Sequence, residues 1–239
     1  MRHFGEPLVD SVFDFGRRAK KPLQAELLDF LAASFMASDW HFKDLHRLIL
    51  TSEAYRLSSS NRDADAATLS LDRENRTYWR MNSRRMESQV IRDSLLHLAG
   101  TLDLQRGGPP LDPKQGGSRG SLYFRQSRDT KSTFLETFDN ANILQCYRRS
   151  ESIVPQQALA MANSKIALDQ AAMIAARLSG PDLIGEAFEI LLARPPSADE
   201  REACSDYLAE LEEIQGDAAR VRARLVHVLI NHNDFVTIR

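Results

Sequence analysis

Arginine and aspartate side chains that could hold an anionic ligand gather in the middle of the sequence. The arginines are Arg84, Arg85, Arg92, Arg125, Arg148 and Arg149. Guanidinium groups bind carboxylate, sulfate and phosphate through paired hydrogen bonds. Asp93 or Asp139 could act beside them as a general base, or could only orient an arginine. We therefore predict a ligand-binding cluster. The alternative is a buried ion-pair network that ties irregular segments to the core.

Two short motifs lack the context that their chemistry needs. Residues 116–120 match the Gly-x-Ser-x-Gly pattern of a nucleophile elbow. That turn needs a strand before the serine and a helix after it, whereas a proline-rich stretch comes first here, so we predict a flexible loop. Residues 14–16 (Asp-Phe-Gly) resemble a kinase metal-binding triplet, but no glycine-rich nucleotide loop precedes them.

The histidines and cysteines predict no metal site. The six histidines include no pair four residues apart, so a zinc or iron site would have to be assembled from distant segments. Cys146 lies close to Arg148 and Arg149, which would favour a reactive thiolate, but a free cysteine is more often a small buried hydrophobe. A disulfide between Cys146 and Cys204 would form only outside the cytosol. We expect no metal or cofactor in this chain.

The composition is typical of a folded domain without strong affinity for nucleic acid. Of the 239 residues, 43% are hydrophobic and 27% are charged, and the formal net charge is −2. A protein that coats nucleic acid is usually strongly basic. A membrane-spanning helix needs about 18 or more consecutive apolar residues, and no such run occurs.

Helical periodicity dominates the chain and must position the polar cluster. Apolar residues recur at helical spacing over four stretches, 22–38, 43–55, 86–98 and 155–178. The last is expected to break near 163–164. Asp72 is expected to cap a helix over 74–81, and 63–72 is expected to be a connection. Gly100 suits the left-handed end of a helix.

A glycine- and proline-rich stretch interrupts the helices. Residues 107–120 hold five of the 11 glycines and three of the 9 prolines, a composition that predicts a long loop. Residues 121–125 are predicted to form a short strand. Residues 130–152 show weak periodicity and are expected to be irregular.

Three helices are predicted at the C-terminal end, over 183–193, 198–214 and 218–232. Ser197 and Glu200 have the spacing of a capping box that starts the second of them. We therefore predict a mainly α-helical fold with one short β element. Its main domain spans 1–180 and carries a loop and strand insert at about 101–152, and a three-helix unit spans 181–239.

An ordered set of short segments resembles a planctomycete-type domain family of unknown function. The matching segments include His3-Phe4-Gly5, Glu26-Leu27-Leu28-Asp29, Leu45-His46-Arg47-Leu48-Ile49, Trp79-Arg80-Met81-Asn82, Arg92-Asp93, Phe138-Asp139, Pro155-Gln156-Gln157 and Arg194-Pro195-Pro196. Members of this family end large exported bacterial proteins that carry a cytochrome-c-like haem domain upstream. The resemblance implies a periplasmic or extracytoplasmic location and haem c in an associated domain. It implies no established reaction.

Three functions are compatible with these observations. In the first, the chain is an accessory module whose arginine-rich face binds an acidic or sulfated polysaccharide, or docks a neighbouring haem-containing domain. In the second, it is an enzyme of unassigned class with Asp93 or Asp139 as base and the arginines as substrate clamps. In the third, it is a scaffold. An open hollow lined by several of these arginines and aspartates would favour binding or catalysis. Side chains that satisfy one another's hydrogen bonds inside the fold would favour the scaffold.

Overall fold

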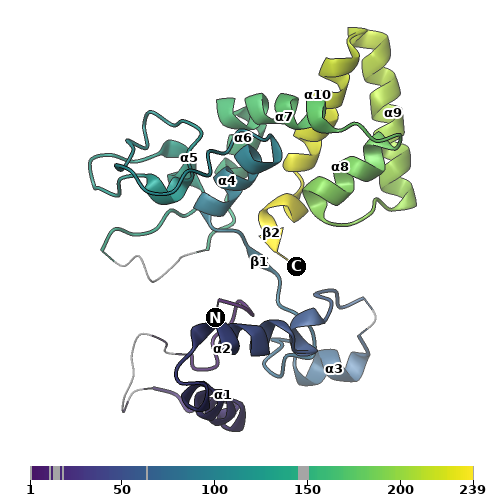
Figure 1. Ribbon diagram of the computed structural model, residues 1–239. Helices are drawn as coiled ribbons and strands as arrows, with labels where there is room; N and C mark the ends of the chain where they lie inside the picture. The colour runs from purple at the N-terminus through teal and green to yellow at the C-terminus, as the bar shows by residue number, and fades with distance from the viewer. Residues whose placement is uncertain are drawn as a thin grey trace. The chain divides into compact units, whose positions relative to one another are not determined.

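The computed structural model describes residues 2–10, 12, 17, 19–62, 64–144 and 151–238. These residues form ten α-helices, three short 3-10 helices and one small two-stranded antiparallel sheet (Figure 1). The predicted mainly helical fold is therefore confirmed. None of the helices described is both long enough and apolar enough to cross a membrane.

The chain divides into two compact units, Met1–Arg84 and Arg85–Ile238. The three predicted C-terminal helices lie within the second unit. The domain boundary expected at residue 180 stays a prediction.

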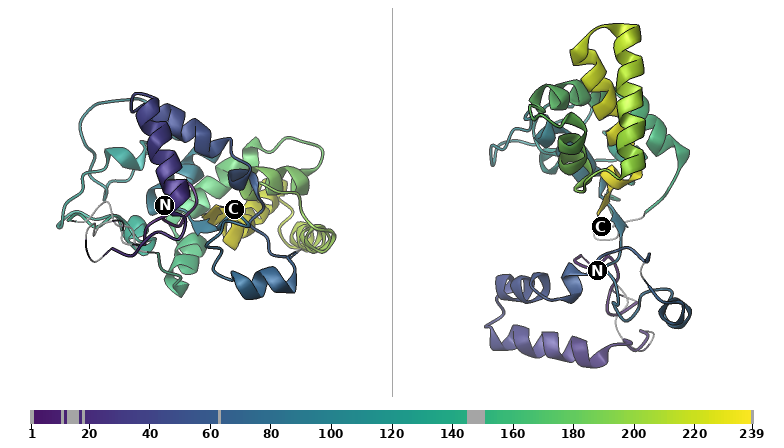
Figure 2. Two further views of the ribbon diagram at one scale, coloured as in Figure 1. Left: turned by 90° about the horizontal axis from the view of Figure 1, so that it is seen from below. Right: turned by 90° about the vertical axis from the view of Figure 1, so that its right-hand side faces the viewer.

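The first unit contains short helices with few buried side chains. Its elements are α1 (Ala25–Ala37), α2 (Phe42–Leu50), the 3-10 helix η1 (Ala54–Arg56) and α3 (Ala66–Leu71). Helices α1 and α2 contact each other and form a hairpin (Figure 2). The ring of Phe35 lies 5.3 Å from that of Trp40 and 5.0 Å from that of Phe42, and these contacts close the corner between the two helices.

Two local predictions for the first unit are wrong. The stretch 63–72, which was expected to be a connection, contains α3. Asp65 is the N-cap of this helix, because its carboxylate accepts a hydrogen bond from the backbone N–H of Thr68 at 2.5 Å. The expected helix over 74–81 does not form. Asn75 and Tyr78 have φ values of 57° and 56°, which a right-handed helix excludes. Asp72 closes a turn by accepting from the backbone N–H and the hydroxyl of Thr77.

The second unit holds the main core. Its elements are α4 (Ser88–Leu98), η2 (Ser121–Tyr123), α5 (Thr133–Thr137), α6 (Pro155–Asn163), α7 (Lys165–Arg177), α8 (Leu183–Leu192), α9 (Ala198–Gln215), α10 (Ala218–Ile230), η3 (Asn233–Val236) and strand β2 (Thr237–Ile238), which pairs with β1 (Arg84–Arg85). Helix α10 packs against α7, α8 and α9 (Figure 1). The side chains of Leu225, Val226 and Ile230 on α10 are completely buried.

The predicted helix boundaries in this unit are largely confirmed, because local signals set them. Ser164 ends α6 and begins α7, where its hydroxyl accepts from the backbone N–H of Ala167. Ser197 and Glu200 form both hydrogen bonds of the predicted capping box. Gly100 follows α4 with a φ of 73°, the left-handed conformation that glycine adopts without strain.

The predicted strand over 121–125 is wrong. Residues 121–123 form the 3-10 helix η2, and the small sheet lies elsewhere. The glycine- and proline-rich stretch is irregular, as predicted, and several contacts tie it down. The guanidinium group of Arg119 lies 3.9 Å from the centre of the Tyr123 ring and donates to the carbonyl oxygen of Gly107. The backbone N–H of Gly107 in turn donates to the Tyr123 hydroxyl.

An ion-pair network fastens the C-terminal helices to one another. Both carboxylate oxygens of Glu200 accept from Arg194, at 2.7 and 2.8 Å, and Arg194 also donates to Asp234 at 2.8 Å. The Asp234 side chain is 3% exposed, whereas those of Arg194 and Glu200 are about 30% exposed. The hydrogen bonds from Arg194 lower the pKa of Glu200 from 4.5 to about 2.

We expect this network to make the stability of the protein depend on acid pH. A carboxyl group with a depressed pKa in the folded state stabilises the fold above its unfolded pKa of 4.5, and this stabilisation disappears as the pH falls toward about 2. Glu200→Gln keeps a residue that suits a capping box but removes the charge. The variant should be less stable than the wild type by about 1 kcal/mol at pH 7, after allowance for solvent screening.

Urea unfolding at pH 7, 5 and 3.5 tests this expectation. The difference in free energy of unfolding between wild type and Glu200→Gln should shrink as the pH falls. Glu213→Gln on the same helix is the matched control, because the Glu213 carboxylate is exposed and forms no ion pair in the described part of the chain. A difference that stays constant with pH would contradict the expectation.

Candidate functional site

Two of the predicted site residues, Arg92 and Asp93, lie side by side on α4 and hold the glycine-rich stretch. The Arg92 side chain is only 4% exposed, and it donates to the Asp93 carboxylate at 2.9 Å. It also donates to the carbonyl oxygens of Gly117 and Arg119, at 2.5 and 3.0 Å. Burial lowers the pKa of Arg92, and the neighbouring Asp93 opposes this shift. Arg92 therefore joins α4 to the end of the loop.

Besides Arg92, Asp93 has one further hydrogen-bond partner among the described residues, Ser121 of η2. Its two carboxylate oxygens accept from the backbone N–H of Ser121 at 3.0 and 2.8 Å, and one of them accepts from the Ser121 hydroxyl at 2.7 Å. Ser121 also accepts from Arg92 at 3.2 Å. These three side chains form one network, which we call the Arg92 network.

Asp139 and Arg85 belong to a second network. Asp139 accepts from the backbone N–H of Ser152 at 2.7 Å and from its hydroxyl at 2.9 Å. Gln157, which is 3% exposed, donates to Asp139 at 3.4 Å and accepts from Arg85 at 3.0 Å. Arg85 also donates to the side chain of Asn233 at 3.3 Å. This network has no residue in common with the Arg92 network.

Arg84 and Arg125, two of the other predicted arginines, are not members of either network. Arg84 is in the first unit, where its Nε atom is buried without a hydrogen-bond partner among the described residues. Arg125 is exposed and lines a separate hollow. Cys146, Arg148 and Arg149 lie outside the described residues, as does the triplet at 14–16. That all the predicted arginines share one ligand stays a prediction.

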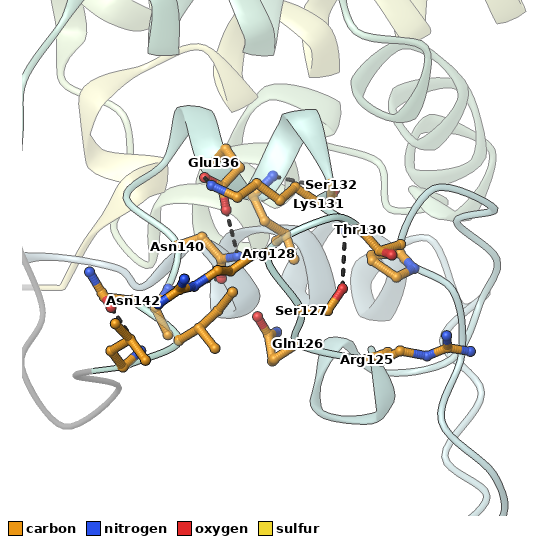
Figure 3. A pocket seen from close by; sticks show the side chains of 15 residues that line it. Arg125, Gln126, Ser127, Arg128, Thr130, Lys131, Ser132, Glu136, Asn140 and Asn142 are labelled. Atoms are coloured by element: carbon orange, nitrogen blue, oxygen red, sulfur yellow. Dashed lines mark hydrogen bonds and ion pairs between the residues drawn. The ribbon is translucent and has the colours of Figure 1, made fainter.

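The hollow beside Arg125 encloses about 500 Å³ and carries three cationic side chains (Figure 3). We call it the basic hollow. It is lined by Pro113, Arg125, Gln126, Ser127, Arg128, Thr130, Lys131, Ser132, Leu135, Glu136, Asn140, Ala141, Asn142, Ile143 and Leu144. Its cations are Arg125, Arg128 and Lys131, and Glu136 is its one acidic residue. The lining therefore has an excess of positive charge.

Hydrogen bonds fix one wall of the basic hollow. Lys131 pairs with one oxygen of Glu136 at 3.2 Å, and Asn140 donates to the other at 2.9 Å. Gln89 on α4 donates to the Asn140 side chain at 2.7 Å. The short helix α5, which begins with the Ser132 cap, is thereby connected to α4.

Arg125 and Arg128 are free to bind a ligand. Both are exposed, and their guanidinium groups form no hydrogen bond or ion pair within the described residues. The backbone of Arg125 is nevertheless held in place, because its N–H donates to the carbonyl oxygen of Leu111 at 2.8 Å. Figure 3 shows Arg125 at one end of the basic hollow, apart from Arg128 and Lys131. This spacing suits a ligand with several separated negative charges.

Comparison with known proteins identifies the family. Residues 1–208 match the model of the PSD1 family, described as a protein of unknown function (DUF1553). The chain belongs to the PSD1 family. No curated protein and no solved structure matches the chain. The PSD1 match includes the whole Arg92 network and every residue of the basic hollow.

Two of the three cations of the basic hollow in this PSD1 chain, Arg128 and Lys131, were not predicted from the sequence. Arg128 and Lys131 follow Arg125 at intervals of three residues, a spacing that could have indicated them. This segment was predicted to be irregular, and an irregular segment has no period that places side chains on one face. The three-residue spacing therefore did not indicate a shared site. The short helix α5 and its contact with α4 bring the three cations to one hollow.

Proposed function

We propose that this PSD1 chain is an accessory module whose basic hollow binds an extended anionic ligand, an acidic or sulfated polysaccharide. The observation that supports this proposal most is the pair of exposed guanidinium groups, Arg125 and Arg128, which lack ion-pair partners within the described residues. Guanidinium groups without an internal partner are available to sulfate or carboxylate groups, which accept two hydrogen bonds at once. An exported parent protein with a haem domain is part of the same proposal.

The residues suggested for catalysis are better suited to holding the fold together. Asp93 lines a hollow of about 580 Å³ near His97 and Leu122, but its oxygens already accept three hydrogen bonds from Ser121. A general base must be within reach of the proton that it removes. The occupied carboxylate of Asp93 therefore favours a structural role, and an enzymatic function has less support than ligand binding.

Titration with dextran sulfate tests the proposed binding, with neutral dextran of the same size as the reference ligand. We expect the double variant Arg125→Ala/Arg128→Ala to bind dextran sulfate about tenfold more weakly or worse, because each lost charged hydrogen bond contributes about 1.5–3 kcal/mol. Binding by the wild type should also weaken with added salt, because exposed charges are screened.

The double variant Arg222→Ala/Arg224→Ala on α10 is the matched control. Both arginines are exposed, so this variant loses the same net charge far from the basic hollow in sequence. It should bind dextran sulfate as the wild type does. An equal loss of affinity in the two double variants would mean that only net charge matters, and would overturn the proposed site. Absence of binding by the wild type would overturn it as well.

A further inference from the structure

Two histidine rings from distant parts of the sequence meet in the first unit. The Nε2 atom of His3 lies 3.0 Å from the Nδ1 atom of His46, and the ring centroids are 5.0 Å apart with a tilt of 45°. His46 lies on α2. His3 is positioned by the next residue, Phe4, whose ring packs against Tyr55 at 5.8 Å and Tyr78 at 5.0 Å. The fold thus pairs two imidazoles that are 43 residues apart.

The space between the two nitrogens admits one proton at most. An imidazole pair in hydrogen-bond contact shares a single N–H, because two N–H groups that faced each other would repel. A neutral imidazole leaves one ring nitrogen with a lone pair, and this is the form that binds metal ions.

We propose that His3 and His46 together bind one divalent metal ion that favours imidazole, such as Zn²⁺ or Cu²⁺. Two nitrogens bound to one zinc ion, each at about 2.0–2.1 Å, are roughly 2.8–3.4 Å apart for angles between a right angle and the tetrahedral value. The observed 3.0 Å separation lies within this range. Because His46 is exposed and His3 half-buried, an ion can reach them from solvent.

The proposed site has only two protein ligands and is therefore open. Among the described residues, no group of three or more His, Cys, Asp and Glu side chains could hold a metal ion. The remaining coordination positions are left to water or to an added ligand, as in metal sites that keep an exchangeable position. The nearby charge of Arg84 opposes a bound cation, so we expect modest affinity.

Calorimetric titration of the metal-free full chain with ZnCl₂ at pH 7.5 tests the proposal. The wild type should bind about one equivalent, and His3→Ala and His46→Ala should each bind about tenfold more weakly or worse, because each loses one of the two ligands. His97→Ala on α4 is the matched control, since His97 is exposed and lies in the second unit. Its affinity should equal that of the wild type.

A measurement on the wild type covers the case in which a histidine variant fails to fold. One equivalent of Cu²⁺ should give an electron paramagnetic resonance spectrum with hyperfine coupling to two imidazole nitrogens. A spectrum without coupling to histidine nitrogen would overturn the proposal. Unchanged zinc affinity in folded His3→Ala and His46→Ala variants would also overturn it.

Discussion

Replacement of Arg92 by alanine is expected to lower the free energy of unfolding by about 3–5 kcal/mol, the usual cost of breaking a buried ion pair from one side. The change leaves the Asp93 carboxylate without its cation. It also removes the donor to the carbonyl oxygens of Gly117 and Arg119. Buried polar groups without partners cost about 1–3 kcal/mol each. Urea unfolding at pH 7 measures the loss.

The same variant should loosen the glycine- and proline-rich stretch before the whole protein unfolds. Arg92 is the side chain that joins this stretch to α4, together with Asp93. Trypsin should therefore cleave after the exposed Lys114 faster in Arg92→Ala than in the wild type. Arg128→Ala is the matched control, because Arg128 is an exposed arginine without an ion pair in the described part of the chain, and its stability should change by less than about 0.5 kcal/mol.

Asp93→Asn separates the structural role of the Arg92 network from a catalytic one. The amide group of asparagine cannot accept as many hydrogen bonds as a carboxylate, so contacts to Ser121 and Arg92 would be lost. If the network is structural, Asp93→Asn should lose about 1–3 kcal/mol of stability. A folded Asp93→Asn with unchanged stability, or an Arg92→Ala variant that loses less than about 1 kcal/mol, would contradict the structural role.

The second large effect is expected at the centre of the helical core. Leu225 on α10 is completely buried in the cluster where α10 meets α7, α8 and α9. Leu225→Ala should lower the free energy of unfolding by about 2–5 kcal/mol, because the truncation removes buried apolar surface and leaves a cavity. Urea unfolding at pH 7 is again the measurement.

Val228→Ala is the matched control on the same helix. The sequence alone does not distinguish these two apolar positions, but Val228 is 49% exposed. Its replacement removes little buried surface, and alanine has the higher helix propensity. We expect a change within about 0.5 kcal/mol. Equal losses in Leu225→Ala and Val228→Ala would mean that the packing of α10 differs from the one described.

Local signals in the sequence determined most of the helices. The apolar period and the start signals of α7, α9 and α10 act over about four residues, which is the range of a helical hydrogen bond. For this reason Ser164 and Ser197 could be placed from the sequence. The prediction failed where local preferences were weak. Residues 121–123 have an apolar, aromatic character that suits a strand, but contacts with α4 fold them into a 3-10 helix.

The identity of the chemically important residue types was also visible in the sequence, but their environment was not. Arg92 precedes the glycine- and proline-rich stretch 107–120 in the sequence, and Arg125 follows it. Arg92 is buried because loop residues 25 to 29 positions away supply its acceptors, whereas Arg125 stays exposed because nothing in the described residues folds over it. Contacts over such distances depend on how the helices pack, and no periodicity or spacing encodes them.

The sequence by itself therefore determined that this PSD1 protein is helical, where its C-terminal helices begin, and that its arginines and aspartates carry its polar chemistry. Only the tertiary structure decided which of these charged side chains form ion pairs and hydrogen bonds within the fold and which line a hollow. It also decided that His3 and His46 meet. The physical reason is that helix formation is set by neighbours within one or two turns, whereas burial and pairing of charges are set by residues brought together through packing.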